Sequence, residues 1–406
     1  MNRQNEESGN YSGNIVPDGL SKLQLSLRKF VAPEYIFGMD ARLMAGIYCK
    51  NLGGKKVFLV TDKGVKGAKW FAEIEQTLKN QNISYHIFSG VSPNPRDYEV
   101  TTGVTEYRES QCNMILAVGG GSVLDCAKGI GIVSTNRGDV YDFEGVDKIE
   151  RPMPPLVCIP TTAGTSADVS QFAIINNTRE KYKMAIISKA VVPDASLIDP
   201  YVLTTMDKFL TACTGMDALS HAFEAFVSNA SSAFTDLFSM EAIRLIHENL
   251  MNSINDPGNI QFRGKVMLAS LYAGLAFSNA SLGCVHSMAH SLGGYLDLPH
   301  GECNAILLPH VVEFNFDTSA LRYKKIAEIF DVNISGMTDN QAKKALKSFI
   351  VEHIRMLGIT STLRTKGVST DLISVLSQKA IKDPCNATNP KSPTKGDLET
   401  IYSEAM

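Results

Sequence analysis

Between residues 55 and 200, short apolar segments alternate with segments of helical periodicity, and this alternation restricts the possible folds more than any other feature. Apolar runs typical of buried strands lie at 57–61, 84–88, 114–118 and 156–160. Predicted helices separate them: one at 65–79, one that runs through Tyr107 and one that starts at about Ser122. Strands that are apolar on both faces and separated by helices form parallel sheets covered on both sides. We therefore expect an α/β domain.

The periodicity changes near Leu203. Before it, segments 172–176 and 183–188 enclose a polar turn and predict a hairpin, and 195–199 predicts one more strand. Helix-periodic runs follow at 217–227, 233–251, 262–277, 286–295 and 342–358. We expect an α/β domain over residues 23–203 and an all-helical domain over residues 204–406, with a cleft between them. Residues 1–22 are polar, lack the apolar core of a signal peptide and predict a disordered leader.

Four side chains in the second half have the types and spacing of a metal site. Asp217 and His221 are four residues apart, so on a helix they lie on the same face. His286 and His300 come from a region that holds four of the chain's eight histidines. One carboxylate and three imidazoles suit a divalent metal such as Fe(II) or Zn(II). Taken singly, each histidine also fits a core residue hydrogen-bonded to the backbone.

A glycine-rich loop predicts a cofactor site in the first half. Gly119, Gly120, Gly121 and Ser122 follow a predicted strand and open a helix. Glycines allow an anion to approach the backbone, and the helix N-terminus favours a pyrophosphate. The loop does not match the Gly-x-Gly-x-x-Gly fingerprint, so a standard Rossmann domain is not predicted.

Two further positions suit the same cofactor. Thr161, Thr162 and Thr165 follow the fourth strand and offer hydroxyls to a phosphate, ribose or nicotinamide; the alternative is an ordinary helix-capping turn. Asp62 follows the first strand and can accept hydrogen bonds from a ribose 2′-hydroxyl, while it repels a 2′-phosphate. This favours NAD over NADP. The alternative for Asp62 is a cap of the next helix.

Composition excludes several other classes of function. The formal net charge is −3 and no basic stripe is present, which argues against a nucleic-acid partner. No segment approaches the roughly 20 consecutive apolar residues needed to cross a membrane. Eight scattered cysteines without a Cys-x-x-Cys pair predict free thiols in the cytoplasm.

Together, these motifs resemble the iron-containing alcohol dehydrogenase family. The resemblance rests on the segments 119–128, 160–165, 214–221 and 286–301 and extends over nearly the whole chain. It implies a dehydroquinate synthase-like architecture, with a dinucleotide-binding α/β domain and an all-helical metal-binding domain. It also implies NAD-linked interconversion of small primary alcohols or short diols and aldehydes, an iron ion held by the four predicted ligands, and a homodimer or larger homo-oligomer.

The resemblance assigns further residues. Cofactor contacts also fall on Asn94, Asp125, Lys183 and Leu203. His290 corresponds to a histidine near the nicotinamide and is the candidate proton relay, with a structural role as the alternative. Phe172, Phe277 and Leu282 are expected to line the substrate pocket. Segment 166–170 and Phe172 depart from the pattern of many members, which leaves the choice of substrate open.

Three other functions share some of these features. A lyase resembling dehydroquinate synthase uses NAD and a metal, but this chain lacks a Lys- and Arg-rich motif for a phosphorylated acid in its metal-binding half. A polyol oxidoreductase resembling glycerol dehydrogenase normally has a shorter ligand set. A non-catalytic binding protein is expected to lose ligands, and none is missing here.

Overall fold

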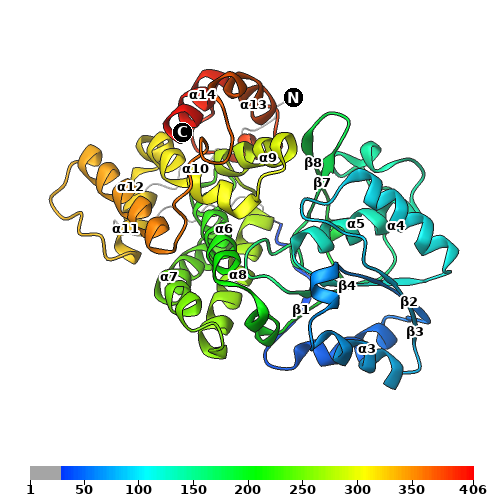
Figure 1. Cartoon of the computed structure of the whole chain (residues 1–406). Helices are drawn as coiled ribbons and strands as arrows, with labels where there is room; N and C mark the ends of the chain where they lie inside the picture. Colours follow the sequence, from blue (N-terminus) through cyan, green and yellow to red (C-terminus); the bar gives the residue numbers. More distant parts are fainter. Residues whose placement is uncertain (1–28) are drawn as a thin grey trace, which may run out of the picture.

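The computed structural model describes residues 29–406. The predicted leader over residues 1–22 lies outside this range. The described chain has two halves: strands and helices make up the first, and helices alone make up the second (Figure 1). Their boundary lies between the last strand, which ends at Ile198, and the first long helix, which begins at Lys208.

A parallel six-stranded sheet forms the centre of the first half. Its strands run in the order β1 (Glu34–Phe37), β9 (Ala195–Ile198), β6 (Leu156–Pro160), β4 (Met114–Gly119), β2 (Lys56–Val60) and β3 (Ser84–Phe88). All neighbouring strands in this sheet pair in parallel. β4 and β6 are buried along their whole length. The predicted parallel sheet is confirmed.

Helices cover both faces of this sheet. They are α1 (Ala45–Asn51), α3 (Phe71–Asn80), α4 (Asp97–Glu109) and α5 (Gly121–Thr135), whereas the short helix α2 (Lys63–Lys66) has no buried residue. Side chains alternate along β2, so Leu59 joins the same core as Leu78 of α3, while Phe58 joins the core that contains Ile130 of α5. The C-terminal end of β4 leads directly into α5, where the glycine-rich loop lies.

The predicted hairpin is present but belongs to a separate sheet. β7 (Phe172–Asn177) and β8 (Tyr182–Ile187) pair antiparallel, and β5 (Gly145–Val146) adds to β8. β7 contacts α5, and β8 contacts α9 of the second half. The hairpin therefore reaches from the α/β half to the helical half.

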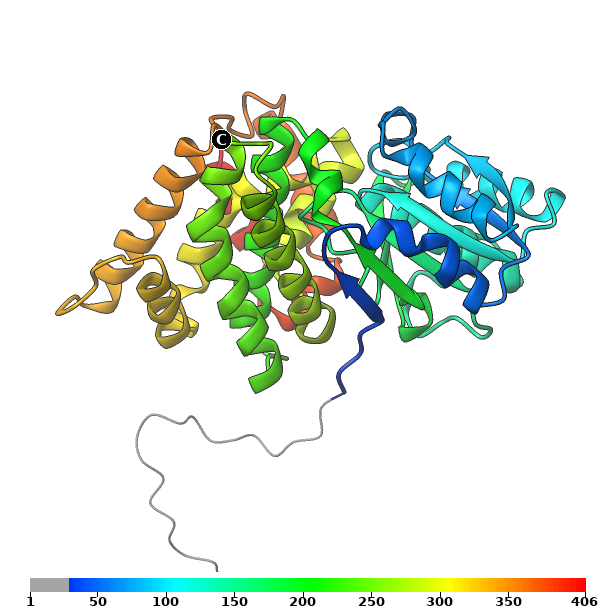
Figure 2. The ribbon, with the colours of Figure 1, turned by 90° about the horizontal axis from the view of Figure 1, so that it is seen from below.

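Helices alone form the second half, as predicted. They are α6 (Lys208–Val227), α7 (Ala233–Asn255), α8 (Ile260–Ala280), α9 (Cys284–Leu296), α10 (His300–Asn315), α11 (Ala320–Ile329), α12 (Asp339–Met356), α13 (Ile373–Ala380) and α14 (Lys395–Glu404). α6 packs against α7, α8 and α10 at the centre of this half, and sixteen of its residues are buried. The view in Figure 2 shows β1 beside the helical half, at its border with the sheet.

In the part of the chain that the structure describes, no single helix has the length and hydropathy to span a bilayer. One pair, α8 and α9, passes such a test jointly, but it is bent by 100° at its junction. The eight cysteines are free and buried, as expected for thiols that pack in the core.

Two expectations about local structure were wrong, and one strand was missed. The single helix predicted over 65–79 is divided into α2 and α3, because Gly67 ends the first turn and the chain bends before Phe71 enters the core. The helix predicted from Asp217 begins nine residues earlier, where Asp207 accepts a hydrogen bond from Leu210 N at 2.8 Å. β1 was not predicted, because its short sequence gains strand structure only by pairing with β9.

Candidate functional site

Three helices bring the four predicted metal ligands together. Asp217 and His221 project from α6, His286 lies in the first turn of α9, and His300 begins α10. The Nε2 atoms of His221, His286 and His300 lie 4.0, 3.6 and 3.7 Å from Asp217 Oδ1. The side chain of His300 is 20% exposed, whereas the other three are at most 5% exposed. The cluster therefore opens on the side of His300.

Hydrogen bonds fix the orientation of two of these imidazoles. His221 Nδ1 donates to the carbonyl oxygen of Gly164 at 3.2 Å. His286 Nδ1 donates to Glu224 Oε2 at 2.5 Å. Carbonyl and carboxylate oxygens accept hydrogen bonds, so both protons are on Nδ1 and both Nε2 lone pairs are left to the cluster. Such partners orient metal-binding histidines in proteins.

Burial and mutual interaction set the charges of the cluster. Burial lowers the pKa of His221 to about 3, and it also lowers the pKa of His300. Burial opposes the charge of His286, but the carboxylates of Glu224 and Asp217 raise its pKa to about 9. Burial likewise opposes the charge of Asp217, but the neighbouring imidazoles hold its pKa below its ordinary value. At neutral pH and without a metal ion, the cluster thus combines a carboxylate, two neutral imidazoles and a protonated His286, and a cation that binds here takes the place of the proton on His286 Nε2.

The hydrogen bonds of Asn304 provide a test of whether the cluster fits a cation. Asn304 Nδ2 lies 2.6 Å from Asp217 Oδ1, 3.1 Å from His286 Nε2 and 3.2 Å from His300 Nε2. An amide group carries two hydrogens and cannot serve three acceptors. The cluster collects more lone pairs than the protein supplies protons for, and a divalent cation satisfies this excess. The residues therefore fit a metal ion.

The two predicted cofactor loops lie against each other. Gly120 is the N-cap of α5 and has no side chain, so no side-chain oxygen occupies the N–H groups that begin the helix. A Cβ atom at Gly121 would lie 2.6 Å from the side chain of Thr165, which explains why glycine is required there. Free N–H groups at a helix N-terminus bind phosphate groups, so the loop fits a dinucleotide pyrophosphate.

A cavity connects the cofactor loop with the metal cluster. It encloses about 680 Å³ of empty space, its open mouth included. It is lined by Asn94, Pro95, Gly121, Ser122, Asp125, Thr165, Ala167, Ser170, Phe172, Ile174, Lys183, His221, Phe277, Leu282, His286, His290, His300 and Cys385. Residues that were predicted separately for metal, cofactor and substrate therefore share one cavity.

Aromatic rings form one wall of this cavity. The ring of Phe277 stacks on His221 at a centroid distance of 4.3 Å, and Phe172 lies 5.8 Å from Phe277. With Leu282, these side chains form a small apolar cluster that also contains Cys385. The wall offers surface to methylene groups and few hydrogen-bonding atoms.

His290 faces the same cavity from α9. Its Nδ1 donates to Asp383 Oδ2 at 2.8 Å, so its Nε2 lone pair is free. Its ring stacks on His300 with centroids 5.3 Å apart. Burial opposes the charge of Asp383, but His290 holds the pKa of Asp383 below its ordinary value.

Six predicted cofactor residues do not line the cavity. They are Asp62, Gly119, Gly120, Thr161, Thr162 and Leu203. Asp62 caps α2 by accepting a hydrogen bond from Val65 N at 2.8 Å, and Leu203 is buried in the core. Gly119 and Gly120 join β4 to α5, and Thr161 donates its backbone N–H to the Gly119 carbonyl at 3.0 Å. For these residues, as for the six that line the cavity, a cofactor contact stays a prediction.

Several polar residues of the site were not predicted from the sequence. Glu224 and Asn304 lie three and four residues after the ligands His221 and His300, so helical spacing could have indicated them. Asp383 is 93 residues from His290 and gives no such signal. Asp297 lies between two ligands and joins the halves, as described next.

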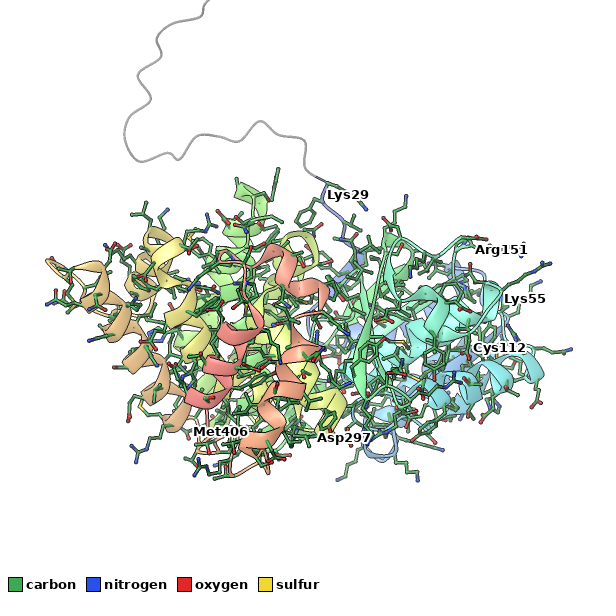
Figure 3. All side chains as sticks on the ribbon, turned by 90° about the horizontal axis from the view of Figure 1, so that it is seen from above. Lys29, Lys55, Cys112, Arg151, Asp297 and Met406 are labelled. Atoms are coloured by element: carbon green, nitrogen blue, oxygen red, sulfur yellow. The ribbon has the colours of Figure 1, made fainter. Side chains whose placement is uncertain are left out.

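Asp297 ties the two halves together beside the cavity. Its carboxylate accepts hydrogen bonds from Asn94 Nδ2 and Arg96 Nη2, each at 2.8 Å. Figure 3 shows Asp297 at the border between the halves. The loop that carries a predicted cofactor contact is thereby attached to the segment between His286 and His300.

Comparison with known proteins agrees with this arrangement. The profile described as "Iron-containing alcohol dehydrogenase" matches residues 32–200, and "Fe-containing alcohol dehydrogenase family, C-terminal" matches residues 211–406. The chain is 41% identical to a 1,3-propanediol dehydrogenase of Klebsiella pneumoniae over 373 residues, covering 91% of this chain and 96% of the relative. It is 34% identical to an NAD-dependent methanol dehydrogenase of Bacillus methanolicus over 377 residues, covering 93% and 99%. A crystal structure of 1,3-propanediol oxidoreductase superposes with a TM-score of 0.90 at 39% identity, covering 94% of this chain and all of that one.

Proposed function

The chain belongs to the iron-containing alcohol dehydrogenase family, and we propose that it interconverts small primary alcohols or short diols and their aldehydes with NAD and one divalent metal ion. Fe(II) is the proposed metal, and the same donors accept Zn(II). The proposed ligands are Asp217, His221, His286 and His300. We further propose a cytoplasmic homodimer or larger homo-oligomer.

One observation carries this proposal: a single cavity is lined by the cofactor loop at one end and by the metal cluster at the other. Hydride transfer requires the nicotinamide and the carbinol carbon to be held in contact. A cavity that joins a pyrophosphate-binding helix N-terminus to a set of metal donors supplies this arrangement.

Each group in the cavity has a part in the chemistry. When bound, the metal ion supplies Lewis acidity that favours alkoxide over alcohol, and NAD accepts the hydride. His290 presents Nε2 to the cavity because Nδ1 donates to Asp383, so Nε2 is the atom that accepts or returns the proton of the alcohol. Phe172, Phe277 and Leu282 exclude water from the reacting carbon.

The cavity wall favours short, uncharged substrates. Its aromatic and aliphatic side chains bury methylene groups, each contributing roughly 0.8 kcal/mol. They leave the extra hydroxyls of a polyol without partners. Among the described residues, Lys183 is the one Lys or Arg that lines the cavity, which disfavours a phosphorylated acid. Two relatives are named for 1,3-propanediol and methanol, which are both short.

The experiment is an assay of NAD reduction by the metal-free protein reconstituted with Fe(II) or Zn(II). The substrates are ethanol, 1-propanol, 1-butanol, 1,3-propanediol and glycerol, compared by kcat/KM. We expect activity with either metal, highest with the monohydric alcohols or 1,3-propanediol. A clear preference for glycerol or for an anionic substrate would contradict the pocket assignment. His286→Ala should lose bound metal and activity together, and full metal occupancy in this variant would remove His286 from the site.

A further inference from the structure

Glu224 is a buried carboxylate beside the metal cluster to which the chemistry above assigns no role. It lies on α6, seven residues after Asp217 and three after His221, so the three side chains share one face of the helix. Glu224 is 4% exposed. Among the ion pairs within residues 29–406, it takes part in only one, with His286.

Both oxygens of Glu224 accept hydrogen bonds from the first turn of α9. Oε1 accepts from the backbone N–H of Val285 at 2.6 Å, and Oε2 accepts from His286 Nδ1 at 2.5 Å. The carboxylate thus binds two consecutive residues, one through its main chain and the other through its side chain. Each contact is short enough to be a charge-assisted hydrogen bond.

The N-cap residue of α9, Gly283, explains why the first turn of this helix needs the hydrogen bonds of Glu224. It occupies the N-cap position of α9 and has no side chain to accept a hydrogen bond from the first turn. A Cβ atom at Gly283 would lie 3.1 Å from Glu224 Oε1 and 2.5 Å from Asn389 Oδ1, so a larger residue would collide with the groups that reach this helix end. Glu224 therefore acts as a cap supplied by another helix, and its negative charge suits a helix N-terminus.

The same carboxylate determines how His286 faces the cluster. Because Nδ1 donates to Glu224, the lone pair of Nε2 remains on the side of Asp217 Oδ1, which is 3.6 Å away. Rotation of the ring would break a hydrogen bond to a buried carboxylate that has no other side-chain partner within residues 29–406. Glu224 thus fixes the Nδ1–H tautomer of this ligand and holds its ring from the side opposite the cluster.

We propose that Glu224 is a positioning residue that sets the metal affinity of the site by holding His286 in its metal-binding tautomer. The proposal rests on the proposed function, since it takes His286 as a ligand. Loss of the hydrogen-bond partner of a ligating histidine typically lowers metal affinity about 10- to 100-fold.

Glu224→Gln tests the proposal in the full-length protein. In the wild type each donor meets a different oxygen of Glu224, so the amide oxygen of glutamine replaces only one of them; held by Val285 N, it turns the amide NH₂ group toward His286 Nδ1. The dissociation constant for Zn(II) is measured by competition with a chromophoric chelator, and the visible absorption spectrum of the Co(II)-substituted protein reports the ligand geometry. The melting temperature of the metal-free protein measures the effect on folding separately.

Asp199→Asn is the matched control. Asp199 is also a fully buried carboxylate; it accepts a hydrogen bond from Arg42 Nη1 at 2.6 Å and from Tyr201 N at 3.0 Å, and it contacts none of the metal donors. Its variant should lower the melting temperature and leave Zn(II) affinity and the Co(II) spectrum as in the wild type.

The expected result for Glu224→Gln is a 10- to 100-fold weaker Zn(II) affinity and an altered Co(II) spectrum. Wild-type affinity and spectrum together with a lower melting temperature would overturn the proposal and leave Glu224 a cap alone. Equal loss of affinity in Asp199→Asn would also overturn it. Failure of the proposed function looks different: the wild-type protein itself would bind no Zn(II) or would not oxidise alcohols.

Discussion

Replacing Asp62 with serine separates the two roles that this residue can have. Asp62 accepts the N–H of Val65 at 2.8 Å and so caps α2, and it is also the predicted partner of a ribose 2′-hydroxyl. Serine caps helices about as well as aspartate, because its hydroxyl oxygen also accepts a backbone N–H. Asp62→Ser therefore keeps the cap and removes the charge.

The size of the effect follows from the charge that is removed. Asp62 is partly exposed, so solvent screens it and the effective dielectric constant lies well above that of a protein interior. A 2′-phosphate carrying nearly two charges, about 5 Å from the carboxylate, is repelled by about 1.5–3 kcal/mol. Removing the charge should narrow the preference for NAD over NADP about 10- to 150-fold. As N-caps, Asp and Ser differ by only a few tenths of a kcal/mol in the free energy of folding.

The assay compares kcat/KM for NAD and NADP with one alcohol at fixed ionic strength, for the wild type, Asp62→Ser and Asp62→Ala. Alanine removes both the cap and the charge, so it should lower the melting temperature while giving the same change in cofactor preference as serine. A wild-type enzyme that uses NADP as well as NAD would refute the reasoning. An unchanged preference in Asp62→Ser would restrict Asp62 to the cap.

Three further changes test other parts of the site and the fold. Phe172→Leu should leave more room beside the apolar wall of the cavity. The ratio of kcat/KM for 1-hexanol to that for ethanol should then rise about fourfold for each methylene that the cavity newly accommodates. An unchanged ratio would place Phe172 outside the pocket. In Asp383→Asn, the N–H of Cys385 that donates to Asp383 Oδ1 at 2.9 Å should hold the amide oxygen and turn the amide nitrogen toward His290. The imidazole proton of His290 would then move from Nδ1 to Nε2, so Nε2 could no longer accept the proton of the alcohol. We expect kcat to fall about 10²-fold or more with little change in KM. A normal kcat would leave His290 a structural residue. Burial lowers the pKa of His353 from 6.5 to about 4. The unfolded chain therefore binds this proton first, so stability is intact above pH 6.5 and falls by about 3 kcal/mol by pH 4. Between pH 7.5 and 5, the melting temperature of His353→Phe should fall less than that of the wild type. An equal fall would show that protonation of His353 is not the cause of the loss of stability.

The parts of the fold that follow from periodicity were predictable. Short continuous apolar runs such as 156–160, separated by helical segments, are typical of strands covered on both faces, and the long runs of helical periodicity after Leu203 are typical of helices. The break at Gly67 and the early start of α6 depend on local capping, which periodicity does not encode. β1 depends on a partner more than 150 residues away along the chain.

The residues of the site likewise include some that their spacing along the sequence could predict and some that it could not. Asp217 and His221 could be paired from their spacing on one helix, and Glu224 and Asn304 carry the same kind of signal. The contact between Asp383 and His290 could not be predicted, because it joins segments 93 residues apart. It exists only once the 3-10 turn at Pro384–Thr388 packs against α9.

The hydrogen bond between Gly164 O and His221 Nδ1 has a thermodynamic consequence. It joins the loop predicted to contact the cofactor directly to a predicted metal ligand, over a distance of 3.2 Å. A rearrangement of this loop on dinucleotide binding must alter the hydrogen bond that orients the imidazole of His221. Linkage then requires reciprocity: the factor by which the metal strengthens dinucleotide binding equals the factor by which the dinucleotide strengthens metal binding. The concentration of either one in the cell would therefore affect how firmly the protein retains the other.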